Sequence, residues 1–250
     1  MKTSIPEKKE SMLAVLIDGD NAQASLLPKM LSEVGKHGSV TIRRIYGDWT
    51  TANMNSWKET LHNHAVQPIQ QFRFTVGKNA TDSALIIDAM DILHRQLVNG
   101  FCIVSSDSDY TRLATRIREE GVFIMGIGQK KTPKSFVNAC DIFIYTENIA
   151  PPKESKPRQQ PHSKARQKIE LYAGADPLPL LREAYEMVVQ ESGWADLGPM
   201  GKALLQLDPG FDPRTYGCKQ LSQLLKSLAS DFELRRDDDS PSGLFVRLKE

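Results

Sequence analysis

Short apolar runs alternate with helical patterns through the first part of the chain. The apolar runs are rich in β-branched residues and predict strands at 12–17, 40–46, 66–71, 101–104, 122–127 and 142–145. The segments between them predict helices at 22–34, 53–64, 82–98, 110–120 and 133–139. We expect Thr81 to cap the helix at 82–98, with Asp82 in its first turn. The alternation predicts an α/β fold, with a mostly parallel sheet flanked by helices.

A different pattern fills residues 176–250. Apolar positions at helical spacing predict three helices, at 178–193, 197–208 and 219–230. Two short extended runs follow in FELRRDDDSPSGLFVRL and predict a β-hairpin. We expect Trp194, Phe211 and Tyr216 to be core residues. Three helices and a hairpin together predict a small winged helix-turn-helix domain.

The two patterns are separated by a basic segment of linker composition. Lys and Arg against Asp and Glu number 17 and 16 in residues 1–150, 6 and 2 in residues 151–175, and 9 and 13 in residues 176–250. The middle segment is rich in Pro, Gln, Lys and Arg and carries few core-forming residues. We therefore predict domains at 1–150 and 176–250, joined by a flexible basic linker at 151–175.

Composition narrows the class of protein. The chain has 250 residues, of which 40% are hydrophobic and 25% are charged, and no stretch approaches the roughly 20 apolar residues of a membrane span. Its first residues lack the apolar core of a signal peptide, so we predict a cytoplasmic protein without membrane contact. Cys102, Cys140 and Cys218 are odd in number and widely spaced, which predicts neither a disulfide framework nor a zinc site.

Two of the predicted strands end in pairs of aspartates. Asp18 and Asp20 follow the run at 12–17, and Asp107 and Asp109 follow the run at 101–104. Because ligands of parallel sheets bind at the carboxyl ends of the strands, we expect these acids to share one crevice. Their mutual repulsion calls for a hard cation with oxygen ligands, which predicts a site for Mg²⁺ or Mn²⁺.

Each acid also has a purely structural interpretation. Asp20 and Asp109 could cap the helices that follow them, and Asp82 could favour its helix dipole. Asp88 and Asp91 lie further along the predicted helix, where a solvated or supporting role is expected.

Four segments of the first domain together resemble the NYN domain, a PIN-like family seen in LabA-type proteins. They are LIDGDN at 16–21, KNATDSALIIDAMD at 78–91, VSSDSDY at 104–110 and GVFIMGIG at 121–128, and the resemblance covers roughly residues 11–148. It implies a PIN-like parallel sheet of order 3-2-1-4-5. It also implies an acidic metal cluster of Asp18, Asp82, Asp107 and Asp109, with Asn21 as its polar companion. Ser106 stands where many relatives have glycine, and the role of Asp20 stays open.

The second domain is similar to the OST-HTH or LOTUS domain. Gly193-Trp194, the stretch PGFDPRTYG and the L-x-x-L-L spacing carry this resemblance, which implies RNA binding and, in some members, a protein partner. Because this domain has a net negative charge, RNA affinity would rest on a local patch such as Arg214, Lys219 and Lys226, on shape or stacking, or on the basic linker beside it. In the first domain Lys78, Lys130, Lys131 and Lys134 are candidates to meet substrate phosphates.

These observations predict a metal-dependent ribonuclease with a C-terminal RNA-binding module. A carboxylate cage holding one or two Mg²⁺ ions can activate water and stabilise the charge that develops in phosphodiester hydrolysis. Asp18 and Asp107 are the expected principal ligands. A catalytically inactive RNA-binding adaptor is the main alternative, and a phosphatase using Asp18-Gly19-Asp20 as nucleophile and acid is a third. The RNA substrate, the mode of cleavage and the oligomeric state stay open.

Overall fold

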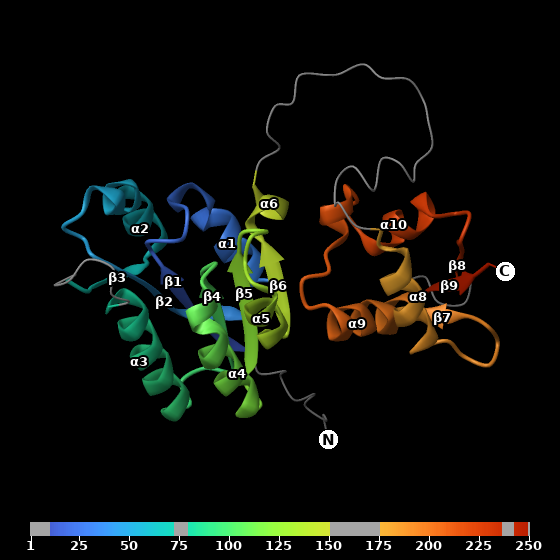
Figure 1. The fold of residues 1–250 in the computed structure, drawn as a ribbon, viewed down its shortest axis with the longest axis horizontal. Coiled ribbons are helices and arrows are strands. Elements are labelled where there is room, and N and C mark those ends of the chain that lie inside the picture. Colours follow the sequence, from blue (N-terminus) through green and yellow to red (C-terminus); the bar gives the residue numbers. More distant parts are fainter. Residues whose placement is uncertain (1–10, 73–79, 151–175, 237–242, 250) are drawn as a thin grey trace, which may run out of the picture. The chain divides into compact units, whose positions relative to one another are not determined.

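A computed structural model gives the fold (Figure 1) and describes residues 11–72, 80–150, 176–236 and 243–249. The chain divides into two compact units, residues 1–150 and 151–250. The predicted linker and Lys78 lie outside the described residues.

The first unit is built on a six-stranded sheet in which every neighbouring pair of strands is parallel. Its order is β3-β2-β1-β4-β5-β6, which confirms the predicted α/β class and adds β6 beyond the order that the resemblance implied. The strands are β1 (Met12–Asp18), β2 (Ser39–Gly47), β3 (Gln67–Gln70), β4 (Gly100–Val104), β5 (Phe123–Gly128) and β6 (Ile142–Tyr145). The central strands are buried on both faces, which explains their continuous apolar runs.

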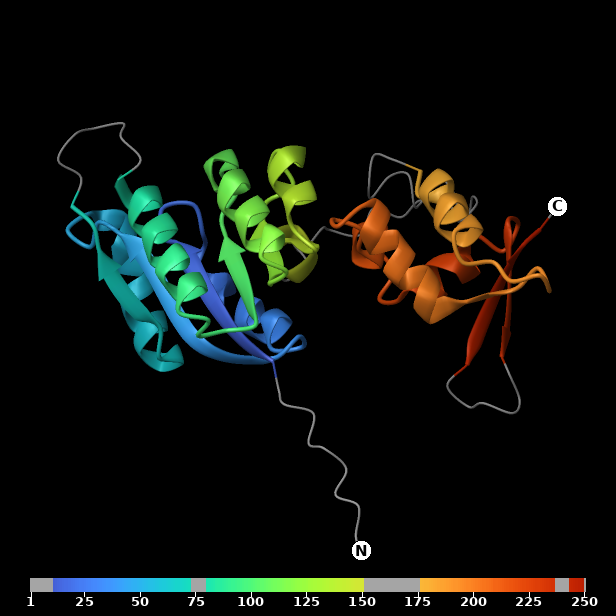
Figure 2. The ribbon, with the colours of Figure 1, turned by 90° about the horizontal axis from the view of Figure 1, so that it is seen from below.

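Helices cover both faces of this sheet (Figure 2). On one face, Ala14 and Leu16 of β1 pack with α3 (Ala80–His94), α4 (Thr111–Glu119) and α5 (Lys134–Ala139). On the other face, Val15 and Ile17 pack with α1 (Leu27–Val34), α2 (Lys58–His64) and α6 (Thr146–Ile149), the last of which was not predicted. Short 3-10 turns lead into three of the helices: η1 (Ala24–Leu26), η2 (Ala52–Trp57) and η3 (Ser108–Tyr110).

Helix α3 is attached to β2 through Asp88. Its carboxylate accepts hydrogen bonds from the Arg44 guanidinium and from the Tyr46 hydroxyl. Asp88 is therefore not solvated but forms an ion pair, and a supporting role for it stays a prediction. The prediction that Thr81 caps the helix is wrong, because α3 already includes Ala80. The Thr81 hydroxyl is buried and has no hydrogen-bond partner among the described residues.

The second unit contains three α-helices and a small antiparallel sheet among its described residues. The elements are α8 (Leu178–Glu186), β7 (Ala195–Asp196), α9 (Leu197–Leu207), η4 (Pro213–Tyr216), α10 (Leu221–Ser227), β8 (Phe232–Arg236) and β9 (Leu244–Leu248). The sheet order is β7-β9-β8, so the predicted helices and hairpin are present. Helix α8 ends at Glu186 and not at the predicted Gly193, because the chain turns back between these two residues. The Tyr185 hydroxyl donates to the Gly193 carbonyl, and Gln190 N donates to the Trp194 carbonyl.

The three aromatic residues that were expected in the core of the second unit are buried or half-buried. Trp194 is buried, and Phe211 and Tyr216 pack against the core of the second unit. All three cysteines are free thiols; Cys102 and Cys140 are buried and Cys218 is partly buried. No helix within the described ranges has the length and apolar character needed to cross a membrane.

Candidate functional site

The candidate acids lie where the strand order of the large sheet reverses. Chain connections diverge to opposite sides between β1 and β4, and a crevice is expected at the carboxyl ends of these two strands. Asp18 is the last residue of β1, and Asp107 follows β4. Gly19 lets the backbone approach β2 closely, since a Cβ atom there would lie 2.8 Å from the Tyr46 carbonyl oxygen. The sequence therefore delivers acids from two adjacent strands to one edge.

Asp18 is held by three donors. It is only 1% exposed. Its Oδ2 accepts from Asn21 Nδ2 at 2.6 Å and from Ser105 Oγ at 2.8 Å, and its Oδ1 accepts from the Asp20 backbone N at 3.2 Å. Ser105 Oγ in turn accepts from the Asp107 backbone N at 3.1 Å. One serine hydroxyl thus joins the ends of β1 and β4.

Asp82 and Asp107 are oriented by local hydrogen bonds. The buried Tyr110 hydroxyl donates to Asp82 Oδ1 at 2.6 Å. Asp107 Oδ1 accepts from the Asp109 backbone N at 3.0 Å, which makes Asp107 the N-cap of η3. The cap is therefore Asp107, whereas Asp109, for which capping was the structural interpretation, is exposed and lies within the first turn of η3.

The acids interact electrostatically. Burial raises the pKa of Asp18, and repulsion from Asp82 adds to the rise, while the hydrogen bonds from Asn21 and Ser105 oppose it. Burial also raises the pKa of Asp82, with added repulsion from Asp107, Asp109 and Asp20, against the hydrogen bond from Tyr110. The neighbouring acids therefore make ionisation of Asp18 and Asp82 more costly, and a cation at this edge would reverse that effect.

The donor chemistry fits a hard divalent cation, although the side chains do not form a closed cage. Within the described ranges, no three side chains of His, Cys, Asp or Glu are close enough together to hold a metal ion. Asp18, Asp82 and Asp107 each direct an oxygen toward a local donor instead. Carboxylate oxygens are nevertheless the ligands that Mg²⁺ and Mn²⁺ prefer.

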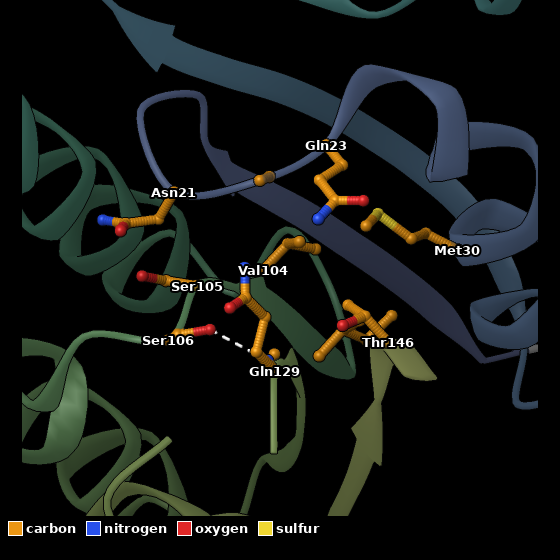
Figure 3. A pocket seen from close by; sticks show the side chains of 11 residues that line it. Asn21, Gln23, Met30, Val104, Ser105, Ser106, Gln129 and Thr146 are labelled. Atoms are coloured by element: carbon orange, nitrogen blue, oxygen red, sulfur yellow. Dashed lines mark hydrogen bonds between the residues drawn. The ribbon is translucent and has the colours of Figure 1, made fainter. Parts of the chain in front are cut away.

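Two depressions border this edge. A pocket of about 10 Å³, enough for one water molecule, lies among the ends of β1, β4 and β5 (Figure 3). Its lining includes Asn21, Ser105 and Ser106, and Ser106 Oγ accepts from the Gln129 backbone N at 2.9 Å. A larger open groove of about 540 Å³ begins at Gly19 and Asp20. Polar uncharged side chains predominate along it: Gln23, Ser25, Asn53, Ser56 and Thr60.

The predicted phosphate-binding residues differ in their surroundings. Lys130, Lys131 and Lys134 are exposed near the carboxyl end of β5, and the backbone N of Lys130 donates to the Glu147 carboxylate. In the second unit, Lys219 and Lys226 are exposed.

Arg214 is engaged in its own turn. Its Nη2 lies 2.7 Å from Asp212 Oδ2, and its Nε also contacts that carboxylate. Asp212 therefore offsets the charge of Arg214, and the role of Arg214 toward RNA stays a prediction.

Sequence reasoning missed Ser105 and Tyr110. Ser105 joins Asp18 to the backbone of Asp107, and Tyr110 joins η3 to Asp82 of α3. Both lie inside VSSDSDY, so a search for donors beside the predicted acids would have found them.

Replacing Asp18 by asparagine is expected to stabilise the metal-free protein near neutral pH. Because folding raises the pKa of Asp18 above 3.8, the stability gained by its protonation is complete below that value and is lost as pH rises through the folded-state pKa. Asp18→Asn removes the charge, and a flip of the Asn21 amide restores a donor–acceptor pair. Thermal unfolding in EDTA should show a higher midpoint for the variant at pH 8, shrinking toward pH 4. An advantage that is constant with pH would contradict this cause.

Comparisons with known proteins agree with this geometry. The family model for the NYN domain matches residues 12–147, and that for the OST-HTH/LOTUS domain matches residues 175–242. No curated protein matches the chain.

Among solved structures, a protein of unknown function from Vibrio parahaemolyticus is 15% identical, with a TM-score of 0.47, over 56% of this chain and 94% of that one. An uncharacterized protein from Nitrosomonas europaea is 30% identical, with a TM-score of 0.29, over 41% and 93%. MurG of Acinetobacter baumannii is 12% identical, with a TM-score of 0.35, over 62% and 48%.

TM-scores below 0.5 do not establish a shared overall fold, so the family models carry the assignment. Because the first of them spans more than half of the chain, the protein belongs to the NYN domain family, and its C-terminal part is an OST-HTH/LOTUS domain.

Proposed function

We propose that the protein is a metal-dependent ribonuclease. One observation carries the proposal: Asp18, Asp82, Asp107 and Asp109 interact electrostatically at the edge where the sheet order reverses. NYN domains have a PIN-like, nuclease-type fold, and OST-HTH domains are RNA-binding modules, which supports the assignment. We also propose that the protein is cytoplasmic, with domains at residues 1–150 and 176–250 and a flexible linker at 151–175.

The four acids are assigned different roles according to their positions. We assign Asp18 and Asp107 as principal ligands, and Asp82 and Asp109 as further ligands or as acceptors that orient the attacking water. When bound there, Mg²⁺ or Mn²⁺ activates that water and stabilises the negative charge of the transition state. Asp82 and Asp107 are only half-buried, so their side chains have room to turn toward a cation.

Neighbouring donors position these acids. Asn21 and Ser105 hold the Asp18 carboxylate without adding negative charge, and Tyr110 holds Asp82. The exposed Lys130, Lys131 and Lys134, which follow β5, supply positive charge near the same sheet edge, where they can bind substrate phosphates. The groove beginning at Asp20 has room for a nucleotide.

A cleavage assay with three substrates tests this function. The chain is incubated with labelled single-stranded RNA, the same sequence as DNA, and a chromogenic phosphate monoester, each with Mg²⁺, Mn²⁺ or EDTA. We expect cleavage of RNA with either metal and none with EDTA. Turnover of the monoester alone would instead indicate a phosphatase.

A catalytically inactive RNA-binding adaptor is the second candidate. It is favoured by two observations: Asp18, Asp82 and Asp107 are engaged in local hydrogen bonds, and no three His, Cys, Asp or Glu side chains of the described residues lie close enough to hold a metal. This alternative predicts RNA binding without cleavage under every metal condition.

A further inference from the structure

The outer face of the small sheet in the second unit carries an unusual group of side chains. Residues on one strand alternate between faces. In the β8–β9 pairing, Leu234 lies opposite Val246, and Val246 is buried in the core. Arg235 and Arg247 therefore lie on the opposite, outward face, together with Phe245. Trp194, the residue before β7, lies against these two arginines.

Two guanidinium groups stack on one indole. The Cζ atoms of Arg235 and Arg247 lie 4.4 Å and 4.8 Å from the centroid of the Trp194 ring. Such cation–π contacts hold the arginines in place while leaving their in-plane donors available for other partners. Both arginines are exposed. One indole thus holds two like charges close to its ring.

The charge of this group is only partly balanced. Arg247 Nη2 pairs with Glu233 Oε2 at 2.6 Å. Arg235 makes no ion pair with any of the described residues, and Arg236 is exposed beside it at the end of β8. One carboxylate therefore faces two guanidiniums, in a part of the chain whose net charge is negative. Arg214, by contrast, is neutralised in its own turn.

We propose that Arg235 and Arg247, held in place by the buried Trp194, form the contact of this domain for single-stranded RNA. The proposal rests on the RNA-binding role above and names a surface for it. The two guanidiniums present fork-shaped donors that match phosphate oxygens. The half-buried Phe245 on the same face offers a ring on which a base can stack. This pairing of planar cations with an aromatic surface favours RNA over an acidic peptide, which supplies carboxylates but no bases.

Binding of a labelled single-stranded RNA to the full chain tests this contact, in EDTA so that no cleavage intervenes. We expect Arg235→Ala/Arg247→Ala to bind about 10-fold more weakly, with a salt dependence shallower by roughly 1.4 in log–log slope for two lost phosphate contacts. Arg235→Lys should bind more weakly than the unaltered chain but keep its salt slope, because charge remains while the planar donor is lost.

Arg182→Ala is the matched control. Arg182 belongs to the same unit, is 48% exposed like Arg247, and pairs with Asp231; its replacement should leave binding unchanged. Far-ultraviolet circular dichroism of each variant checks folding, and the single variant Arg235→Gln serves if the double variant unfolds.

Three results would overturn the proposal. One is unchanged affinity in the folded Arg235 variants while the unaltered chain binds RNA. Another is competition by polyglutamate as effective as that by unlabelled RNA of equal charge, which would indicate an acidic protein partner. The third is that the unaltered chain binds no RNA. This result would also contradict the proposed function, whereas the other two would contradict only the proposed contact.

Discussion

Replacing Asp107 by asparagine is expected to lower magnesium-dependent RNA cleavage by at least about 100-fold while the protein stays folded. Asparagine keeps the N-cap of η3, because its side-chain oxygen can still accept from the Asp109 backbone N. What disappears is one negative charge at the edge of the sheet. Initial rates on labelled RNA over a range of Mg²⁺ concentrations measure the loss.

Asp91→Asn is the control for this variant. Asp91 is also an aspartate of the first unit, but it is exposed and lies near the far end of α3 from Asp82. Its replacement should leave the rate within about twofold, as expected for a surface change away from the site. Equal rates for Asp107→Asn and the unaltered chain would show that the acids of this edge do not carry the chemistry.

Replacing Asp88 by alanine is expected to lower the free energy of unfolding of the first unit by about 2–3 kcal/mol. Arg44 and Asp88 side chains are only 29% and 24% exposed, and removing the carboxylate leaves a largely buried guanidinium and the Tyr46 hydroxyl without their acceptor. Arg44 Nε already has no partner among the described residues. Unfolding in urea, monitored by the hydrogen exchange of the β2 and α3 amides, measures the loss of stability in this unit alone.

A second substitution separates the cost of the orphaned charge from the loss of the contact. In Asp88→Ala/Arg44→Leu no unpaired guanidinium remains, so the double variant should be more stable than Asp88→Ala. Asp91→Ala is the control, since an exposed acid on the same helix should cost less than about 0.5 kcal/mol. Equal losses for Asp88→Ala and Asp91→Ala would contradict the structural role of the ion pair.

The sequence predicted the sheet because its central strands are buried on both faces and therefore appear as uninterrupted apolar runs. Asp18 and Asp107 could be predicted to share one edge of the sheet, because each follows one of these apolar runs. The contact between Arg44 and Asp88 joins residues 44 positions apart, and no local pattern marks such a pair. Capping by Asp107 depends on backbone geometry after β4, which spacing alone does not give.

The surface of the second unit was missed for a related reason. Arg235 and Arg247 share a face only in the register that pairs Leu234 with Val246. The sequence gives the two runs of the hairpin but not this pairing, so exposed cations of helices and turns were the more visible candidates.

The burial of Asp18 has a consequence for engineering this chain. Natural proteins are rarely at their stability optimum, and a carboxylate whose ionisation is opposed by burial and by Asp82 is a position where a neutral side chain should raise stability. In the proposed nuclease the same substitution removes a metal ligand. A more stable variant selected at this position should therefore be a less active one, the trade-off expected where a site is costly to fold.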